Sequence, residues 1–351
     1  MKPKERVLAA IARQRVDQVP FDYIGTPEID HKLGKYFGVQ GDNRIRECLH
    51  VELRHIFPPY SGPELPAAAD GSVRDIWGTV RRPVSNQAGQ YMETVVRPLA
   101  ALHSMEEVEA YHWPDPDWYD YEALRRMAAE WPGMAIVLGH PGVFDLINGT
   151  AHGRGMEQFL IDLAMREPII MAMLGKRFSF WYRFLDRALA RAGDLVDIVF
   201  IGDDYGTQDR MLLSLPMWEE IFADKLRQII GLVHGYGCQV MLHSCGNNRD
   251  LLPRLITLGV DVFQTVQPEA KGMEPGRLIC DFGSHMAFHG TISIQKTLPF
   301  GTPDDVRHEV ADRIALGRDR GGLIVAPAHN IQADTSLENI LALYQAPRVP
   351  A

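Results

Sequence analysis

Short apolar runs rich in Val, Ile and Phe alternate along the chain with longer segments whose apolar residues recur at helical spacing. Such alternation is typical of βα units around a parallel sheet. The apolar runs predict strands at 19–23, 135–139, 198–203, 239–243, 260–264, 286–289 and 323–327, and the longer segments predict helices that include 156–163, 216–234, 248–257 and 303–318. These units predict the α/β class and a (β/α)8 TIM barrel, with the remaining strand within 45–60.

One stretch departs from the βα pattern. Residues 71–80 and 91–96 alternate polar and apolar side chains as the strands of a β-hairpin do. The stretch 113–118, WPDPDW, is rich in turn residues and predicts a connector. We therefore expect a single barrel domain over 1–351, with an N-terminal elaboration at 71–118 that consists of a hairpin insertion and the connector.

Composition narrows the possible partners. The 351 residues are 46% hydrophobic and 23% charged, which suits a globular protein, and the net charge of −9 disfavours nucleic acid as a partner. No apolar run reaches the roughly 18 residues of a membrane span, and the N-terminus resembles no signal peptide. We expect a cytoplasmic protein that binds no membrane and keeps Cys48, Cys238, Cys245 and Cys280 reduced.

Polar side chains follow nearly every predicted strand. In parallel α/β barrels the reaction site lies at the carboxyl ends of the strands, where loops and helix N-termini open onto the barrel mouth. This rule makes candidates of the following residues: His140, Asp203, Asp204, His243, Cys245, Gln264, Gln267, His289 and His329.

The sharpest signal is the pair His243 and Cys245. Two residues apart on an extended segment, their side chains point to the same side. Imidazole nitrogen and thiolate sulfur are ligands that zinc accepts, and three protein ligands leave a fourth position for substrate or water. His329, at the end of the last strand, would supply the third ligand. We expect a zinc site at His243, Cys245 and His329, all three also catalytic.

The remaining candidates carry less specific roles. We expect Asp204 to point inward as a catalytic residue, while Asp203 caps a turn or helix. Asp204 could bind the metal, orient a ligating imidazole or transfer a proton, and a carboxylate bonded only to loop amides remains the structural alternative. His140, Gln264, Gln267 and His289 are the expected substrate-binding residues. A histidine bonded to a neighbouring carbonyl is the alternative for His140 and His289.

At these residues the sequence resembles the uroporphyrinogen decarboxylase superfamily, which includes the haem-pathway decarboxylase and zinc-dependent methyltransferases that act with corrinoid proteins. The resemblance runs from about residue 4 to 346 and is most specific at 243–247, 290–292, 299–303, 326–330 and 334–339. It implies a barrel fold and a homodimer.

The two branches of the superfamily imply different chemistry. The methyltransferase branch implies a His-x-Cys zinc site, as at His243 and Cys245, a small thiol or methylated substrate, and a corrinoid carried by a partner protein. The decarboxylase branch implies arginines after the first strand, yet 22–30 contains none, and Arg154 or Arg210 would have to line the mouth instead. We expect methyl transfer. The alternatives are decarboxylation of uroporphyrinogen or another carboxylated substrate, and a non-catalytic ligand-binding barrel.

Overall fold

The centre of the molecule is a curled parallel sheet. The computed structural model describes residues 1–65, 68, 70–86, 89–317 and 321–346. Within them, parallel strands follow one another in the order β1 (Leu53–Ile56), β5 (Ala135–Gly139), β6 (Ile198–Gly202), β7 (Gln239–His243), β8 (Val262–Val266), β9 (Ala287–Ile292) and β10 (Leu323–Pro327). The side chains of β5, β6, β8, β9 and β10 are buried throughout, as expected for strands covered on both faces. The α/β class and the barrel-like parallel sheet are confirmed.

The first predicted strand, 19–23, forms only an isolated bridge. Phe21 pairs in parallel with Val325 of β10, and the N–H of Phe21 donates to the Glu52 carboxylate beside β1 at 3.0 Å. This segment therefore lies in the gap between β10 and β1. Pro20 has no N–H to donate, which explains why a regular ladder does not form there. The strand expected within 45–60 is β1.

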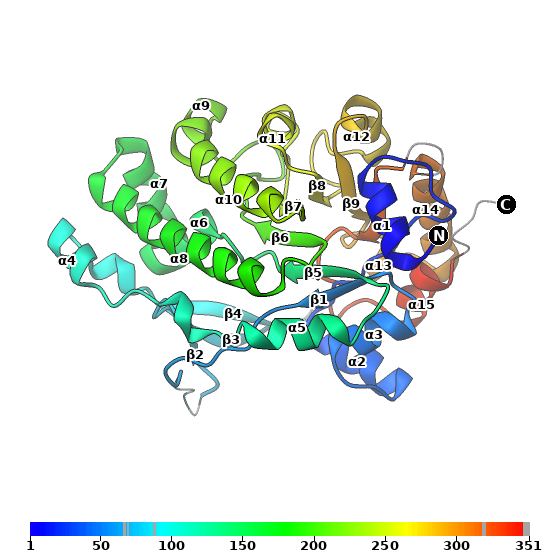
Figure 1. The fold of residues 1–351 in the computed structure, drawn as a ribbon, viewed down its shortest axis with the longest axis horizontal. Coiled ribbons are helices and arrows are strands. Elements are labelled where there is room, and N and C mark those ends of the chain that lie inside the picture. The colour runs from blue at the N-terminus through cyan, green and yellow to red at the C-terminus, as the bar shows by residue number, and fades with distance from the viewer. Residues whose placement is uncertain (66–67, 69, 87–88, 318–320, 347–351) are drawn as a thin grey trace.

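Helices surround the sheet (Figure 1). Those that follow a strand of the sheet cover its outer side, and the longest is α8. The α-helices are α1 (Pro3–Ile11), α2 (Pro27–Phe37), α3 (Asp42–Cys48), α4 (Met105–Ala110), α5 (Glu122–Ala129), α6 (Leu146–Arg154), α7 (Met156–Met165), α8 (Pro168–Ala192), α9 (Leu215–Trp218), α10 (Asp224–Gly235), α11 (Leu252–Leu258), α12 (Pro275–Phe282), α13 (Thr297–Phe300), α14 (Pro303–Gly317) and α15 (Leu337–Gln345). Three short turns complete the set: η1 (Pro98–Ala101), η2 (Pro116–Trp118) and the π-helical η3 (Glu219–Ala223). None of the described helices is long and apolar enough to span a membrane.

The N-terminal elaboration is a separate antiparallel sheet of β2 (Val73–Arg74), β3 (Val80–Asn86) and β4 (Gly89–Val96). The expected hairpin between 71–80 and 91–96 is shifted along the chain. Its main pair is β3 with β4, where Val84 lies opposite Tyr91, and only Val73 and Arg74 of the earlier segment pair with β3. Gly78, with φ of +80°, helps to turn the chain between β2 and β3.

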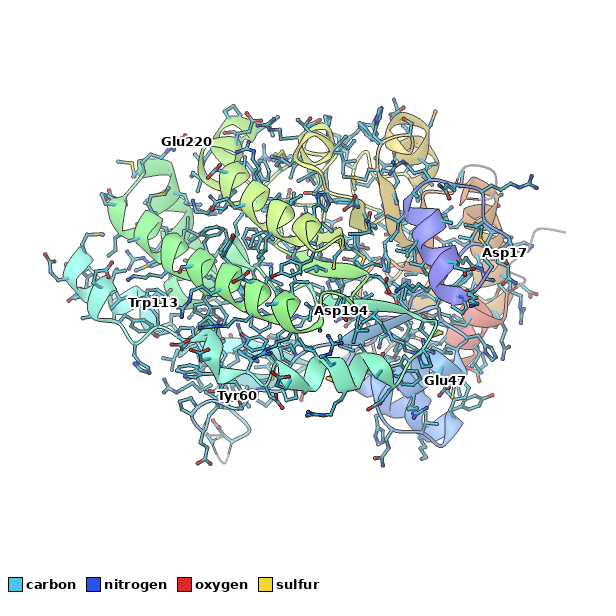
Figure 2. All side chains as sticks on the ribbon, in the orientation of Figure 1. Asp17, Glu47, Tyr60, Trp113, Asp194 and Glu220 are labelled. Atoms are coloured by element: carbon cyan, nitrogen blue, oxygen red, sulfur yellow. The ribbon has the colours of Figure 1, made fainter. Side chains whose placement is uncertain are left out.

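Ion pairs on the surface contribute little to the stability of the fold. Three exposed carboxylates labelled in Figure 2 each contact an exposed arginine; they are Glu47, Asp194 and Glu220, with Arg44, Arg125 and Arg166 as partners. Exposed pairs of this kind contribute about 0–1 kcal/mol each. The continuous apolar core between the strands and helices is therefore the main source of stability.

Candidate metal centre

The loop after β7 is built so that two donor side chains project together. His243 ends β7 and lies in register with Gly202 of β6, where a Cβ atom would come within 2.6 Å of the His243 Cβ. Gly246 follows Cys245 with φ of +78°, a conformation that glycine adopts without strain. Glycines at these two positions therefore leave room for His243 and turn the chain just after Cys245.

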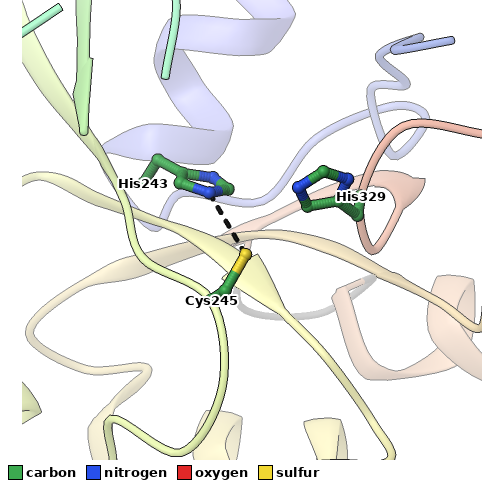
Figure 3. A group of neighbouring side chains, drawn as sticks. All are labelled: His243, Cys245 and His329. Atoms are coloured by element: carbon green, nitrogen blue, oxygen red, sulfur yellow. Dashed lines mark hydrogen bonds between the residues drawn. The ribbon is translucent and has the colours of Figure 1, made fainter. Parts of the chain in front are cut away.

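His243, Cys245 and His329 converge as the sequence predicts (Figure 3). The His243 Nε2 and Cys245 Sγ atoms are 3.3 Å apart, and the rings of His243 and His329 lie 5.7 Å apart, centre to centre. One donor atom from each residue lies within 4.8 Å of the other two. Around tetrahedral zinc such donors are separated by roughly 3.3–3.6 Å, so a small movement would bring all three onto one ion.

Gln264 on β8 fixes the orientation of the His243 ring. Its Oε1 atom accepts a short hydrogen bond from the His243 Nδ1–H. Since an amide oxygen only accepts hydrogen bonds, the proton is on Nδ1, and Nε2 is left as the ligating atom that faces Cys245. The expected substrate-binding residue Gln264 therefore contacts a metal-ligand candidate directly. A mixed imidazole and thiolate set with an oriented imidazole is the kind of site that zinc occupies.

The two neighbouring aspartates have different partners. Asp203 accepts hydrogen bonds from the backbone N–H groups of Ile147 and Asn148, at the start of α6. Asp204 turns toward the site instead. It accepts the Cys245 N–H at 2.8 Å, and its Oδ1 atom lies 3.5 Å from the His243 Nε2. Asp204 therefore stands beside two of the three donors, while Asp203 caps a helix.

Charge is strongly coupled within the group. Burial disfavours a charged His243, yet the Asp204 carboxylate and the Cys245 thiolate together raise the pKa of His243 to about 10. Burial raises the pKa of Cys245, which His243 partly offsets. Burial and the nearby His243 lower the pKa of His329 to about 4. Metal binding at this group would therefore release protons, and its affinity would depend on pH.

Two cavities meet at the candidate centre. The barrel cavity, of about 470 Å³, extends toward α2 and α3 and is lined by Tyr23, Asp30, Arg46, His55 and Phe200 among others. The hairpin cavity, of about 850 Å³, extends under the antiparallel sheet and is lined by Trp77, Arg81, Arg177 and Asp204 among others. His140, His243 and His329 line both cavities. His140 therefore lies where the two cavities meet, and its role in substrate binding stays a prediction.

Two of the expected substrate-binding residues lie elsewhere. His289 is 0% exposed, lines neither cavity, and its Nε2 atom is 3.0 Å from the Asp22 carboxylate. Gln267 is buried and accepts the Gly246 N–H at 2.6 Å, so it supports the loop that carries Cys245. The strand-end rule locates the right end of the barrel, but it does not distinguish side chains that face the cavity from those that face a neighbouring strand.

Arg154 does not line the mouth. It is buried and pairs with Asp162 at 2.8 Å, and it also donates to the carbonyl groups of Leu99 and Leu102. Arg210 is exposed and lines neither of the two cavities. Neither arginine is placed to hold the acidic side chains of a substrate at the candidate centre.

A second group of histidines, His55 and His289 around Asp22, was not predicted from the sequence. The fully buried Asp22 carboxylate lies 3.1 Å from the Nε2 atom of His55 and 3.0 Å from that of His289, with Arg46 Nε at 3.7 Å. Although burial opposes the charge, the two histidines hold the pKa of Asp22 well below its usual range. Asp22 lies inside the predicted strand 19–23, so a rule that looks only at residues at or just after strand ends does not select it. His55 lies on β1, within the stretch 45–60 where the sequence predicts a strand but not its bounds.

The chain belongs to a known family. Residues 86–348 match the model of the family described as Uroporphyrinogen decarboxylase (URO-D), which covers well over half of the chain. The resemblance seen in the sequence is therefore confirmed.

One curated protein and one solved structure are similar to this chain. Over 149 residues, 42% of this chain, the sequence is 27% identical to the methylated-thiol–coenzyme M methyltransferase of Methanosarcina mazei, and the match spans 37% of that protein. A solved structure described as a methyltransferase from Methanosarcina mazei superimposes with a TM-score of 0.67 at 16% identity, over 98% of this chain and 97% of the other. The second likeness shows a common fold.

Proposed function

We propose that this chain is a zinc-dependent methyltransferase that moves a methyl group between a small thiol, or its methylated form, and a corrinoid cofactor on a partner protein. The convergence of His243, Cys245 and His329 where two cavities meet carries the proposal. The name of the Methanosarcina mazei relative, a methylated-thiol–coenzyme M methyltransferase, supports the same chemistry.

The three donors would hold the ion, and zinc bound there would lower the pKa of a coordinated thiol and so favour the nucleophilic thiolate. Asp204 would act as a positioning residue. Burial opposes its charge, but His243, the Cys245 N–H and Asn148 hold the pKa of Asp204 below its usual range. A carboxylate that stays ionised orients its neighbours better than it accepts protons, so the orienting role is favoured over proton transfer.

The two cavities suit two reactants. The barrel cavity would hold the small substrate, because it is the smaller of the two and lies among the strands and helices α2 and α3. The hairpin cavity would admit the corrinoid of the partner, because it is larger and is bounded by the antiparallel sheet outside the barrel. Both reactants would then reach His243 and His329, which line both cavities.

Decarboxylation of a polycarboxylate fits the hairpin cavity less well, because several substrate carboxylates would require unpaired cationic groups there. Arg177 is held by Asp145 at 2.9 Å, and Arg81 lies 3.3 Å from Asp75. These two arginines of the hairpin cavity already have carboxylate partners, so a porphyrinogen carboxylate would have to compete for them.

A direct assay would combine the zinc-loaded protein with methylcobalamin and a small thiol. The thiolate sulfur gains the methyl group as the Co–C bond breaks, cob(I)alamin leaves with the electron pair, and the thiol proton goes to solvent. We expect loss of the methylcobalamin absorbance together with the methyl thioether in the mass spectrum. Cys245→Ser should abolish both signals, whereas Cys280→Ser, at an exposed thiol, should leave them unchanged. Absence of thioether from every thiol tried, or equal activity of Cys245→Ser, would contradict the proposal.

A further inference from the structure

One end of the barrel cavity carries an arginine with unmet hydrogen-bonding capacity. Arg46, on α3, is 5% exposed, and its guanidinium donates through Nη2 to the Tyr23 carbonyl at 2.7 Å. Its Nε and Nη1 atoms are buried and have no hydrogen-bond acceptor. The nearest carboxylate oxygens, of Asp22 and Asp42, lie at 3.7 and 3.9 Å, beyond hydrogen-bonding distance.

Asp22 is already occupied by other donors. Its Oδ1 atom accepts the Tyr23 N–H at 2.7 Å, and its Oδ2 atom lies within hydrogen-bonding distance of His55 and His289. Asp42 is mostly exposed, so solvent screens its charge. Arg46 can therefore still bind an acceptor, and a carboxylate matches the fork of its guanidinium.

A carboxylate in the same cavity is short of a partner of opposite charge. Asp30, on α2, accepts one hydrogen bond from the Tyr23 hydroxyl at 2.5 Å and forms no ion pair within the described part of the chain. Burial raises the pKa of Asp30 to about 6, so that the group is still mostly ionised at neutral pH. A partly buried carboxylate without a cation favours a cationic ligand group.

Tyr23 joins these two charged groups. Its hydroxyl is bonded to Asp30, and the Arg46 guanidinium carbon lies 5.5 Å from the centre of its ring. Phe57 and Phe200 add apolar surface to the cavity, which reaches His243 and His329. The cavity therefore offers one positive group, one negative group and an apolar path to the candidate metal centre.

We infer that the barrel cavity binds a small zwitterion, whose carboxylate accepts hydrogen bonds from Arg46 and whose ammonium pairs with Asp30. The class that fits is an amino acid with a thiol or methyl thioether at its far end, directed toward His243, Cys245 and His329. A simple anion would leave Asp30 unpaired, and a simple cation would leave Arg46 unsatisfied. The inference rests on the proposed function only for the identity of the reacting end.

Three ligands of matched length test the charges separately. L-Methionine carries both charges, 3-(methylthio)propylamine lacks the carboxylate, and 4-(methylthio)butanoate lacks the ammonium. In calorimetric titrations of the full chain we expect methionine to bind about tenfold or more tightly than either analogue, since each charge-assisted contact adds affinity. Binding of either analogue within twofold of methionine, or no binding of methionine at millimolar concentration, would overturn the inference.

Substitution of Asp30 or Arg46 should remove the preference for one charged group of the ligand and keep the preference for the other. Asp30→Asn should abolish the advantage of methionine over the butanoate, and Arg46→Met its advantage over the propylamine. Glu28→Gln and Arg44→Met, at exposed positions of the same helices, are matched controls that should keep both advantages. If Arg46→Met does not fold, Arg46→Lys should keep the fold and lose most of the carboxylate preference, because an ammonium lacks the guanidinium fork. Unchanged preferences in the Asp30 and Arg46 variants would contradict the assignment.

Zwitterion binding and zinc-dependent methyl transfer can be tested separately. In Cys245→Ala the candidate metal centre loses its thiolate, while Asp30 and Arg46 are untouched. Charge discrimination that persists in Cys245→Ala supports the zwitterion site on its own. Absence of zinc or of methyl transfer in a wild-type protein that still selects methionine would remove only the proposed function.

Discussion

Two groups of histidines lie in the barrel, and they differ in what the imidazoles face. His55 and His289 both direct Nε2 to one buried carboxylate, that of Asp22. His243 and His329 instead lie beside a thiol and line two cavities. In the first, closed group each Nε2 atom is held by the Asp22 carboxylate, although His55 also lines the barrel cavity. The second, open group keeps donor atoms that a ligand can reach. The partner of a strand-end histidine, rather than the histidine itself, therefore distinguishes a structural group from a candidate metal centre.

The largest effect is expected from the open group. Cys245→Ala removes the sulfur donor of the three-residue group, so zinc affinity should fall by on the order of a hundredfold or more, beyond the loss typical of outer hydrogen bonds. His289→Ala, in the closed group, should leave zinc affinity unchanged. Competition with a chromogenic chelator measures both constants, and equal zinc loss in the two variants would erase the distinction between the groups.

The closed group should respond in stability instead. Asp22→Ala leaves two buried imidazoles and Arg46 without their central carboxylate, so the free energy of unfolding should fall by roughly 3–5 kcal/mol. Urea denaturation checks this value, and the zinc content of the folded fraction should not change. A stability close to that of the wild type would show that the Asp22 network does not hold the fold together.

Gln264 connects the open group to β8 and should produce an intermediate effect. Without its acceptor for the His243 Nδ1–H, Gln264→Ala should weaken zinc binding by roughly 10–100-fold. Gln228→Ala, at an exposed position of α10, is a matched control. The chelator competition applies here as well, and an unchanged zinc affinity would show that ring orientation does not depend on Gln264.

The smallest effect concerns Asp30. It faces the Tyr23 hydroxyl and feels Asp42 and Arg46 of α3, and its pKa is raised to about 6 by burial. The carboxylate is charged above that pH and neutral below it. The advantage of methionine over 4-(methylthio)butanoate should therefore shrink several-fold between about pH 7.5 and about pH 5.5, after correction for the small protonated fraction of the butanoate at the lower pH. Calorimetry at both pH values tests this, and Asp30→Asn should show no such change.

Sequence patterns predicted most of the fold. Fully buried strands such as β5, β6 and β10 appear as short apolar runs that the local sequence specifies. The failures have local physical causes. Pro20 prevents a regular ladder at 19–23, and β1, LRHI, contains charged and polar residues that conceal it. The hairpin register was misplaced because Arg82 and Pro83 interrupt the apolar alternation of β3.

The residues of the candidate site that lie at or just after strand ends could be predicted from the sequence, because the strands themselves could be predicted. His243 and Cys245 share a segment, and His329 ends another strand, so their convergence follows from the barrel. The pairing of His289 with Asp22 joins residues from opposite ends of the chain, and no local pattern signals it. Likewise, the Nε and Nη1 atoms of Arg46 lack acceptors because of how α3 packs against the segment that contains Tyr23, and no local pattern signals this packing.

The most direct test of the central claim is zinc X-ray absorption of the purified protein, with metal content measured on the same sample. We expect about one zinc per chain, with one sulfur and two imidazole nitrogens among its ligands, and loss of the sulfur shell in Cys245→Ala. Less than about a tenth of an equivalent of zinc after loading, or a spectrum without sulfur, would contradict a metal centre at His243, Cys245 and His329.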